Sequence, residues 1–191
     1  AVIGTIGAFL NGRELPAPSL TTPDAASMQE ILASAYSLGA QAFALEASSI
    51  GLEQGRLKGT QLETAAFTNL TRDHLDYHKT FENYRDAKKA FFDGLPKTAF
   101  AITNADDKNG MVMVQNTKAK VKTYSVRSMA DFKAKILECH FGGMYLEIDG
   151  REVGVQFIGK FNVSNLLAVY GAAVMLGQSP ENILIAMSTL K

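Results

Sequence analysis

The stretch TNLTRDHLDYHKTFENYRDAKKAFFDG, residues 68–94, mixes side chains that bind metals or carry charge with an apolar helical pattern. Thr80 is a suitable helix cap, and the apolar positions after it are Phe81, Tyr84, Phe91 and Leu95. Steps of three and four residues connect these positions once Lys88 is included, which places them all on one helical face. The pattern therefore predicts that Lys88 points inward.

An inward-pointing lysine has two interpretations. In the first, the stem of Lys88 lies along apolar surface while the ammonium group reaches water. In the second, burial favours the neutral amine, which can then react covalently. Reaction with carbon dioxide gives a carbamate, whose anionic oxygens suit magnesium. The residues alone leave both interpretations open.

His74 is the metal-binding side chain that belongs with this lysine. It lies fourteen residues before Lys88, which one continuous helix would convert into a separation of about 21 Å. The two can share a site only if the chain turns between them, and the Thr80 cap predicts such a turn. His74 and His78 are four residues apart, as in some zinc sites, but their segment is loop-like and lacks a third soft ligand, so zinc is disfavoured.

Three segments repeat one order of elements: a short apolar run, a polar cluster, then a helix. They are QAFALEASS, TAAFTNLTRDH and TAFAITNADD. Continuous apolar runs suit strands of a parallel sheet that helices cover on both faces, and ligands bind outside the carboxyl ends of such strands. We therefore expect an α/β fold in which the polar clusters converge on one crevice. In the second cluster, Asp73 and Asp76 can instead cap backbone groups or hold Arg72.

The amino-terminal quarter predicts a strand, a turn and a helix. VIGTIGAFL is followed by Asn11-Gly12, which indicates a turn. Thr22, Pro23 and Asp24 predict the N-cap, first-turn proline and first-turn acid of a helix that closes at Gly39.

The last third changes character. Residues from about 120 to 158 alternate around an Asp149-Gly150 turn, which predicts a small antiparallel sheet appended to the parallel one. Gly159 and Asn162 introduce a helix that ends at Gly177, and Ser179-Pro180 starts another.

Composition excludes several classes of protein. Nineteen basic and nineteen acidic side chains cancel, so no net field attracts nucleic acid or an anionic membrane. The one cysteine, Cys139, cannot form an internal disulfide, and no apolar run approaches the roughly 20 residues of a membrane span. We expect a cytoplasmic protein. The opening AVIGTIGAFL lacks an initiator Met, and ILIAMSTLK stops inside a helical pattern, so we also expect a fragment of a longer chain.

Five motifs in fixed order carry a resemblance to a known family. EASS, FTNLTRDHLDYH, YRDAKKAFF, NADD and GKFNVSN together resemble the central ATP-binding domain of the Mur ligases, from about residue 4 to 190. Within that family the sequence is most similar to members that add the third amino acid, diaminopimelate or lysine, to UDP-MurNAc-L-Ala-D-Glu in peptidoglycan biosynthesis. The resemblance implies one P-loop NTPase-like, incomplete α/β domain over residues 1–191.

The resemblance also implies roles for individual residues. Glu46 and His74 match magnesium ligands, and Lys88 matches the carbamylated lysine, so His74 and Lys88 are the predicted catalytic pair. The positions that match residues binding the nucleotide-peptide substrate are Thr21, Thr22, Ser48, Gln54 and Arg56. The positions that match the ATP side are Asn162, Asn165 and Asp106, with Asp107 following it.

Ordinary structural roles compete with several of these assignments. Glu46 can cap a helix from the end of a strand, and Ser48 can do the same. Gln54 can be a plain exposed helical residue. Asn162 can be no more than an N-cap, and Asp106 can end a strand without touching ATP.

The implied reaction is amide ligation driven by ATP. The terminal carboxylate of the D-Glu residue attacks the γ-phosphate to give an acyl phosphate, and an incoming amine displaces phosphate through a tetrahedral intermediate. Negative charge accumulates in these steps, so they depend on charge neutralisation more than on covalent catalysis by the protein. Magnesium and basic side chains supply that neutralisation.

Parts of the family pattern are absent from this sequence. A Gly-rich P-loop ending in Gly-Lys-Thr is missing, as are the amino-terminal and carboxy-terminal domains, so we expect the fragment alone to be inactive. Three alternatives remain: a folylpolyglutamate synthetase-like ligase, a non-catalytic nucleotide- or metal-binding module, and a metal-dependent phosphohydrolase.

Overall fold

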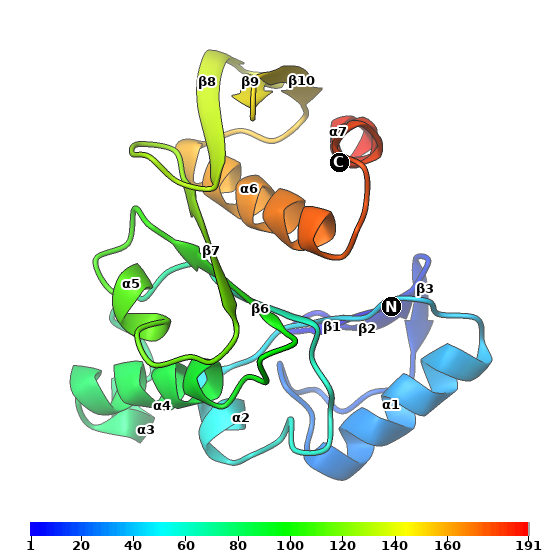
Figure 1. Cartoon of the computed structure of the whole chain (residues 1–191). Helices are drawn as coiled ribbons and strands as arrows, with labels where there is room; N and C mark the ends of the chain where they lie inside the picture. Colours follow the sequence, from blue (N-terminus) through cyan, green and yellow to red (C-terminus); the bar gives the residue numbers. More distant parts are fainter. Residues whose placement is uncertain (191) are drawn as a thin grey trace. The chain divides into compact units, whose positions relative to one another are not determined.

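The computed structural model describes residues 1–190, which form two compact units (Figure 1). The first unit consists of residues 1–61 and 74–88, and the second consists of residues 62–73 and the chain from residue 89 onward. Lys191, the last residue of the expected domain, lies outside the described residues.

A four-stranded sheet organises the first unit, in the order β3-β2-β1-β4. Its antiparallel members are β1 (Val2–Gly4), β2 (Gly7–Leu10) and β3 (Arg13–Leu15), and β4 (Ala44–Leu45) pairs parallel with β1. Asn11 and Gly12 have φ values of 51° and 81°, the left-handed pair that a tight hairpin turn requires. The predicted turn is confirmed, and the stretch before it holds two strands.

Helix α1 (Ala25–Ser37) is capped by a different residue from the one expected. The Asp24 carboxylate accepts hydrogen bonds from the backbone amides of Ala26 and Ser27, each at 3.1 Å. Hydrogen bonds from Ser27, foremost that from its hydroxyl, lower the pKa of Asp24. The prediction that Thr22 is the N-cap is therefore wrong, because the buried Thr22 side chain bonds elsewhere. The predicted closure at Gly39, where φ is 91°, is confirmed.

Three helices carry or adjoin the predicted metal and substrate residues. They are α2 (Ser49–Glu53), α3 (Leu75–His78) and α4 (Phe81–Asp93). Thr80 Oγ1 accepts from the amide of Asn83 at 3.1 Å, and Lys79 has a φ of 67°, so the predicted cap and turn before α4 are confirmed.

The apolar face of α4 departs from the expected one most clearly near the end of the helix. Tyr84 is buried and Lys88 is half-buried, as the pattern predicts. Near the end of the helix Phe92 is buried, whereas Phe91 is only half-buried. The reason is the packing partner: the ring of Phe92 meets Phe67 edge-on, with 6.4 Å between ring centroids.

The second unit is built on a six-stranded, mostly parallel sheet in the order β10-β9-β8-β7-β6-β5. The parallel neighbours are β5 (Thr64–Phe67), β6 (Phe100–Asn104), β7 (Lys120–Ser125) and β8 (Phe132–His140). The antiparallel extension adds β9 (Gly143–Ile148) and β10 (Arg151–Val155). The predicted α/β class is confirmed.

Two details of the predicted topology are wrong. The antiparallel region is smaller than residues 120–158, because β7 pairs parallel with β6 and the antiparallel strands continue the same sheet. The three repeated segments also do not share one sheet, since β4 pairs with β1 while β5 and β6 lie in the larger sheet. β4 is only two residues long and its Ala44 is exposed, unlike a strand buried on both faces.

Helices complete the second unit. They are α5 (Gly110–Met113), α6 (Lys160–Met175) and α7 (Pro180–Thr189). Helix α6 packs across β5 to β8, and α7 contacts α6 and β10 (Figure 1). Gly177 follows the end of α6 with a φ of 83°, and Ser179 caps α7 through the amide of Asn182, as predicted. Within residues 1–190, no helix is long and apolar enough to cross a membrane.

The single cysteine lies at the surface of the larger sheet. Cys139 is a residue of β8, and its thiol is free and exposed.

Candidate functional site

The first unit contains all the residues predicted for metal and muropeptide binding. They are Thr21, Thr22, Glu46, Ser48, Gln54, Arg56, His74 and Lys88. Those predicted for the ATP side, Asp106, Asn162 and Asn165, belong to the second unit.

Thr22 joins three segments of the first unit. Its fully buried hydroxyl lies 2.8 Å from the carbonyl oxygen of Glu46 and 3.1 Å from Ser48 Oγ. The same oxygen accepts a hydrogen bond from the amide of Ser48 at 2.9 Å. Ser48 in turn caps α2, since its Oγ accepts from the amide of Gly51 at 3.1 Å. The capping alternative for Ser48 is thus real, and it coexists with the bonds to Thr22.

Arg56 is held in one orientation by neighbouring acceptors. Its Nη1 donates to the carbonyl oxygen of Thr22 at 2.8 Å, while Nε and Nη2 donate to Gln54 Oε1 at 3.0 and 2.7 Å. Gln54 is fixed at its other end, because Nε2 donates to Tyr77 Oη at 3.3 Å. A guanidinium group has five N–H donors, so both terminal nitrogens keep a second hydrogen for a ligand. This fork suits a carboxylate or a phosphate.

The Glu46 carboxylate is anchored by a residue that the sequence did not single out. Its Oε2 accepts from the amide and from the hydroxyl of Thr5, both at 2.9 Å. Thr5 Oγ1 also lies 3.0 Å from Thr21 Oγ1, so Glu46, Thr5 and Thr21 form one chain of contacts. Thr5 stands in the turn between β1 and β2, and nothing in its sequence context distinguished it from a turn residue.

His74 and Lys88 both contact the buried ring of Tyr84. The His74 and Tyr84 ring centroids are 6.0 Å apart, and Lys88 Nζ lies 5.5 Å from the Tyr84 centroid. His74 occupies the N-cap position of α3 in the left-handed region, with φ 53° and ψ 26°. The turn between α3 and α4 thus brings two side chains, fourteen residues apart in the sequence, to the same ring.

The donor chemistry of the predicted metal set can be tested against these side chains. Within the described part of the chain, no three or more His, Cys, Asp or Glu side chains gather in an arrangement that could hold a metal ion. The predicted set contains one anionic carboxylate and one neutral imidazole, so a third donor has to come from Lys88. A carbamate there would supply the oxygen that magnesium prefers, and on that condition the donor types suit the ion. In the structure Glu46 contacts Thr5, whereas His74 and Lys88 contact Tyr84.

The close approach of α2 to Thr22 supports a prediction about stability. A Cβ added at Gly51 would lie 2.8 and 2.9 Å from Thr22 Cβ and Cγ2, closer than carbon atoms normally pack. Gly51→Ala is therefore expected to destabilise this chain by about 1–3 kcal/mol, which thermal denaturation would detect as a lower Tm. Gly142→Ala is the matched control, because a Cβ there meets nothing within 4 Å. Equal Tm values for the two variants would contradict the packing argument.

The Asp106 and Asp107 carboxylates accept hydrogen bonds that stabilise loops in the second unit. Asp106 accepts from Ser125 Oγ at 2.6 Å and from the amide of Val126 at 2.7 Å. Asp107 accepts from the amides of Leu70 and Asn109 at 3.0 and 2.7 Å. These bonds tie together the segments that follow β5, β6 and β7, so a structural role accompanies any contact with a nucleotide.

Asn162 and Asn165 share one face of α6, as their spacing predicts. Asn165 Nδ2 lies 3.4 Å from Asn162 Oδ1, and Asn162 Nδ2 donates to the carbonyl of Ile158 at 2.9 Å. The N-cap of α6 is Gly159, so the alternative in which Asn162 merely caps the helix is wrong. Asn165 is exposed to solvent.

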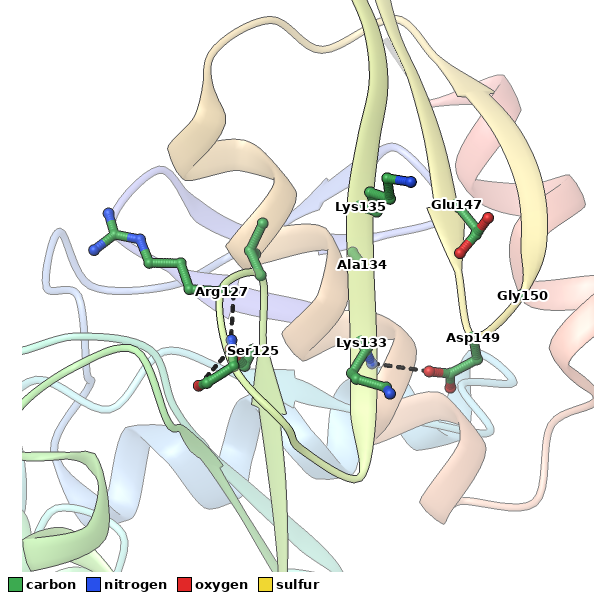
Figure 2. A pocket seen from close by; sticks show the side chains of 10 residues that line it. Ser125, Arg127, Lys133, Ala134, Lys135, Glu147, Asp149 and Gly150 are labelled. Carbon is green, nitrogen blue, oxygen red and sulfur yellow. Dashed lines mark hydrogen bonds between the residues drawn. The ribbon is translucent and has the colours of Figure 1, made fainter.

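A polar pocket of about 380 Å³ opens on the larger sheet. Lys133 and Lys135 of β8 line it beside Glu147 of β9 and Asp149 of the turn that follows β9, as Figure 2 shows. The amide of Lys133 donates to Asp149 at 2.8 Å. None of the predicted site residues lines this pocket. Its mixed charge selects no single class of ligand.

Sequence reasoning missed the role of His78. The ring is buried, with Nε2 2.9 Å from Ser49 Oγ and Nδ1 3.3 Å from Glu53 Oε2. Both nitrogens thus face α2 rather than forming an i, i+4 pair with His74. No periodicity signalled this, because α3 is only four residues long.

Comparisons with known proteins agree with one another. Residues 1–173 match the family model described as "Mur ligase middle domain". A curated relative from Phocaeicola vulgatus, named UDP-N-acetylmuramoyl-L-alanyl-D-glutamate--2,6-diaminopimelate ligase, is 56% identical over 190 residues, which cover 100% of this chain and 39% of the relative. A protein of the same name from Geobacillus kaustophilus is 34% identical over 200 residues, covering 100% of this chain and 41% of the relative.

A solved structure extends the agreement to the fold. A ligase whose structure carries the same name superposes with a TM-score of 0.88 at 33% identity, covering 100% of this chain and 40% of that chain. The chain therefore spans about two fifths of the length of these relatives.

Proposed function

The chain belongs to the Mur ligase family, and on that premise we propose that it is the central part of an ATP-dependent ligase that adds diaminopimelate to UDP-N-acetylmuramoyl-L-alanyl-D-glutamate. Diaminopimelate is preferred over lysine because the relatives described above carry it in their names. Such an enzyme serves peptidoglycan biosynthesis, and therefore cell shape and division. We propose a cytoplasmic location, because its nucleotide substrates would be found there.

The connected network around Thr22 is the observation that supports this proposal most directly. The sequence predicts five residues that bind the nucleotide-peptide substrate: Thr21, Thr22, Ser48, Gln54 and Arg56. Hydrogen bonds of 2.7–3.1 Å join the last four of them into one connected group. Residues held by one another in this way keep their donors in fixed positions, which is how a site aligns a carboxylate for attack.

The reaction begins with the D-Glu carboxylate of the muropeptide. Its oxygen attacks the γ-phosphorus of ATP, ADP leaves, and an acyl phosphate forms. The amine of diaminopimelate then attacks the acyl carbon and displaces phosphate, leaving an amide. Arg56 would hold the substrate through the two hydrogens that its protein partners leave available.

Magnesium is the implied cofactor, and it would supply charge neutralisation for the phosphates. Glu46, His74 and a carbamate on Lys88 would hold it. Asn162, Asn165 and Asp106 would face the adenine nucleotide from the second unit. The parts of the protein outside this chain would hold the uridine and select the incoming amino acid.

The direct test is a ligation assay with the full-length protein. Phosphate release should require both the muropeptide and diaminopimelate, and mass spectrometry should detect the tripeptide product. Lysine in place of diaminopimelate should react poorly. Phosphate release that ignores both substrates would indicate a phosphohydrolase, and glutamate addition to a folate would indicate the folylpolyglutamate synthetase class.

Arg56→Lys is expected to weaken muropeptide binding more than catalysis. A lysine lacks the fork that Gln54 and Thr22 orient, so the KM for the muropeptide should rise about 10–100-fold, equivalent to about 1.4–2.8 kcal/mol. Steady-state kinetics with saturating ATP measures this change. Arg13→Lys, at an exposed position of β3, should leave the KM unchanged. An unaltered KM in the Arg56 variant would remove Arg56 from the substrate site.

A further inference from the structure

The buried ring of His78 has no role in the proposed chemistry, yet it is only 4% exposed and has polar partners on both nitrogens. One partner, Ser49, is 1% exposed, while the other, Glu53, reaches solvent. Burying a polar side chain is costly unless its hydrogen bonds are made. The contacts of His78 therefore fix where α3 lies against α2.

The partners of His78 favour a proton on one particular nitrogen. The Glu53 carboxylate lies 3.3 Å from Nδ1 and, when ionised, can only accept, so it favours the proton on Nδ1. In the neutral ring, Nε2 then accepts, and the Ser49 hydroxyl donates to it across 2.9 Å. Both groups on α2 are thus oriented by one imidazole. Replacing the ring removes two directed contacts at once.

Other contacts of His78 lead toward the predicted metal side of the unit. Its ring centroid lies 5.4 Å from that of Tyr84, the residue whose ring also meets His74 and Lys88. Its backbone carbonyl accepts from Asn83 Nδ2 at 2.9 Å, which fastens α3 to the start of α4.

A second line of contacts leads to the predicted substrate side. The ring of Tyr77 lies 4.9 Å from that of His78. The Tyr77 hydroxyl accepts from Gln54, and Gln54 orients the guanidinium group of Arg56. His78 therefore touches both the residues that position Arg56 and those that position His74 and Lys88.

We propose that His78 is a positioning residue that joins the substrate-binding segment, α2 with Gln54 and Arg56, to the α3–α4 turn that carries His74 and Lys88. It does not touch substrate or metal itself. It acts by keeping Tyr77 and Tyr84 in place. The side chains that bind the muropeptide and the residues on the metal side then keep their positions relative to one another. This inference rests on the proposed function.

The test uses the full-length protein and starts with wild-type ligation of diaminopimelate, which examines the proposed function by itself. His78→Ala is expected to lower kcat and to weaken Mn²⁺ binding, followed by electron paramagnetic resonance, each by about 10–100-fold, as for residues that support metal ligands. The KM for the muropeptide should rise as well. His78→Gln should recover part of each loss, because its amide oxygen can accept from Ser49.

Two further variants cover the case in which His78→Ala does not fold. Ser49→Ala and Glu53→Gln each remove one partner of the ring, and each should lower kcat and Mn²⁺ affinity in the same direction with a smaller amplitude. In the His78→Gln background, Ser49→Ala should abolish the partial recovery, since the glutamine acts through its contact with Ser49. His140→Gln, at an exposed position of β8, is the matched control and should behave as wild type.

The outcomes separate the two claims. Wild-type ligation combined with unchanged kcat, KM and Mn²⁺ affinity in folded His78 variants would overturn the positioning role and leave the function standing. A loss of activity that merely follows the loss of folded protein, with normal Mn²⁺ affinity, would also overturn it. Absence of ligation in the wild type would instead refute the proposed function.

Discussion

Lys88→Ala in the full-length protein is expected to reduce ligation by about 10²–10³-fold, the size of loss seen when a group that stabilises developing charge is removed. The nitrogen of the half-buried lysine lies 5.5 Å from the centre of the Tyr84 ring, which His74 also contacts. If its function is to present a carbamate, the vacated space should accept a small carboxylate. Acetate in the assay should therefore restore part of the rate in a concentration-dependent manner.

The neighbouring lysine provides a matched control for this experiment. Lys89 Nζ lies 2.7–2.8 Å from the carboxylate of Asp93, a helical i, i+4 ion pair. Lys89→Ala should keep the wild-type rate and should not respond to acetate. A wild-type rate for Lys88→Ala without any additive would rule out the carbamate. An equal acetate response in both variants would show that acetate acts elsewhere.

His74→Asn is expected to raise the magnesium concentration needed for half-maximal activity by about tenfold or more, as the loss of a metal ligand should. Asparagine is the better replacement because His74 has a φ of 53°, a left-handed conformation that asparagine tolerates and alanine does not. The variant thus removes the imidazole with little backbone strain. Its rate should be measured across a magnesium titration at saturating ATP.

The control for His74 is again the exposed histidine of β8. His140→Asn should leave the magnesium titration of the full-length protein unaltered. If His74→Asn gives the same midpoint as the wild type, then His74 does not bind the metal. A lower maximal rate with an unaltered midpoint would assign it a different role.

Periodicity predicted the features of the site that depend on one helix. The steps between Tyr84, Lys88 and Leu95 placed the lysine inward, and the Thr80 cap predicted the turn that brings His74 to the same ring. These are local properties, since the residues that create them lie within a few helical turns. Caps, turns and helical faces therefore could be predicted from the sequence.

Contacts between segments distant in sequence could not be predicted in this way. The assignment of Thr22 as a cap failed because its hydroxyl bonds to Glu46 and Ser48, more than twenty residues away. β4 has only two residues, too few to reveal which sheet it joins. The contacts of His78 with Ser49 and Glu53 leave no trace in spacing, because tertiary packing alone brings α2 and α3 together.

The exposed thiol of Cys139 gives this chain a practical advantage in spectroscopy. With only one cysteine in the sequence, a maleimide dye attaches to a single known place on β8. A second cysteine introduced at exposed Tyr36, on α1, would create a donor–acceptor pair with one label in each unit. Energy transfer between the labels would then report the separation of the two units, molecule by molecule.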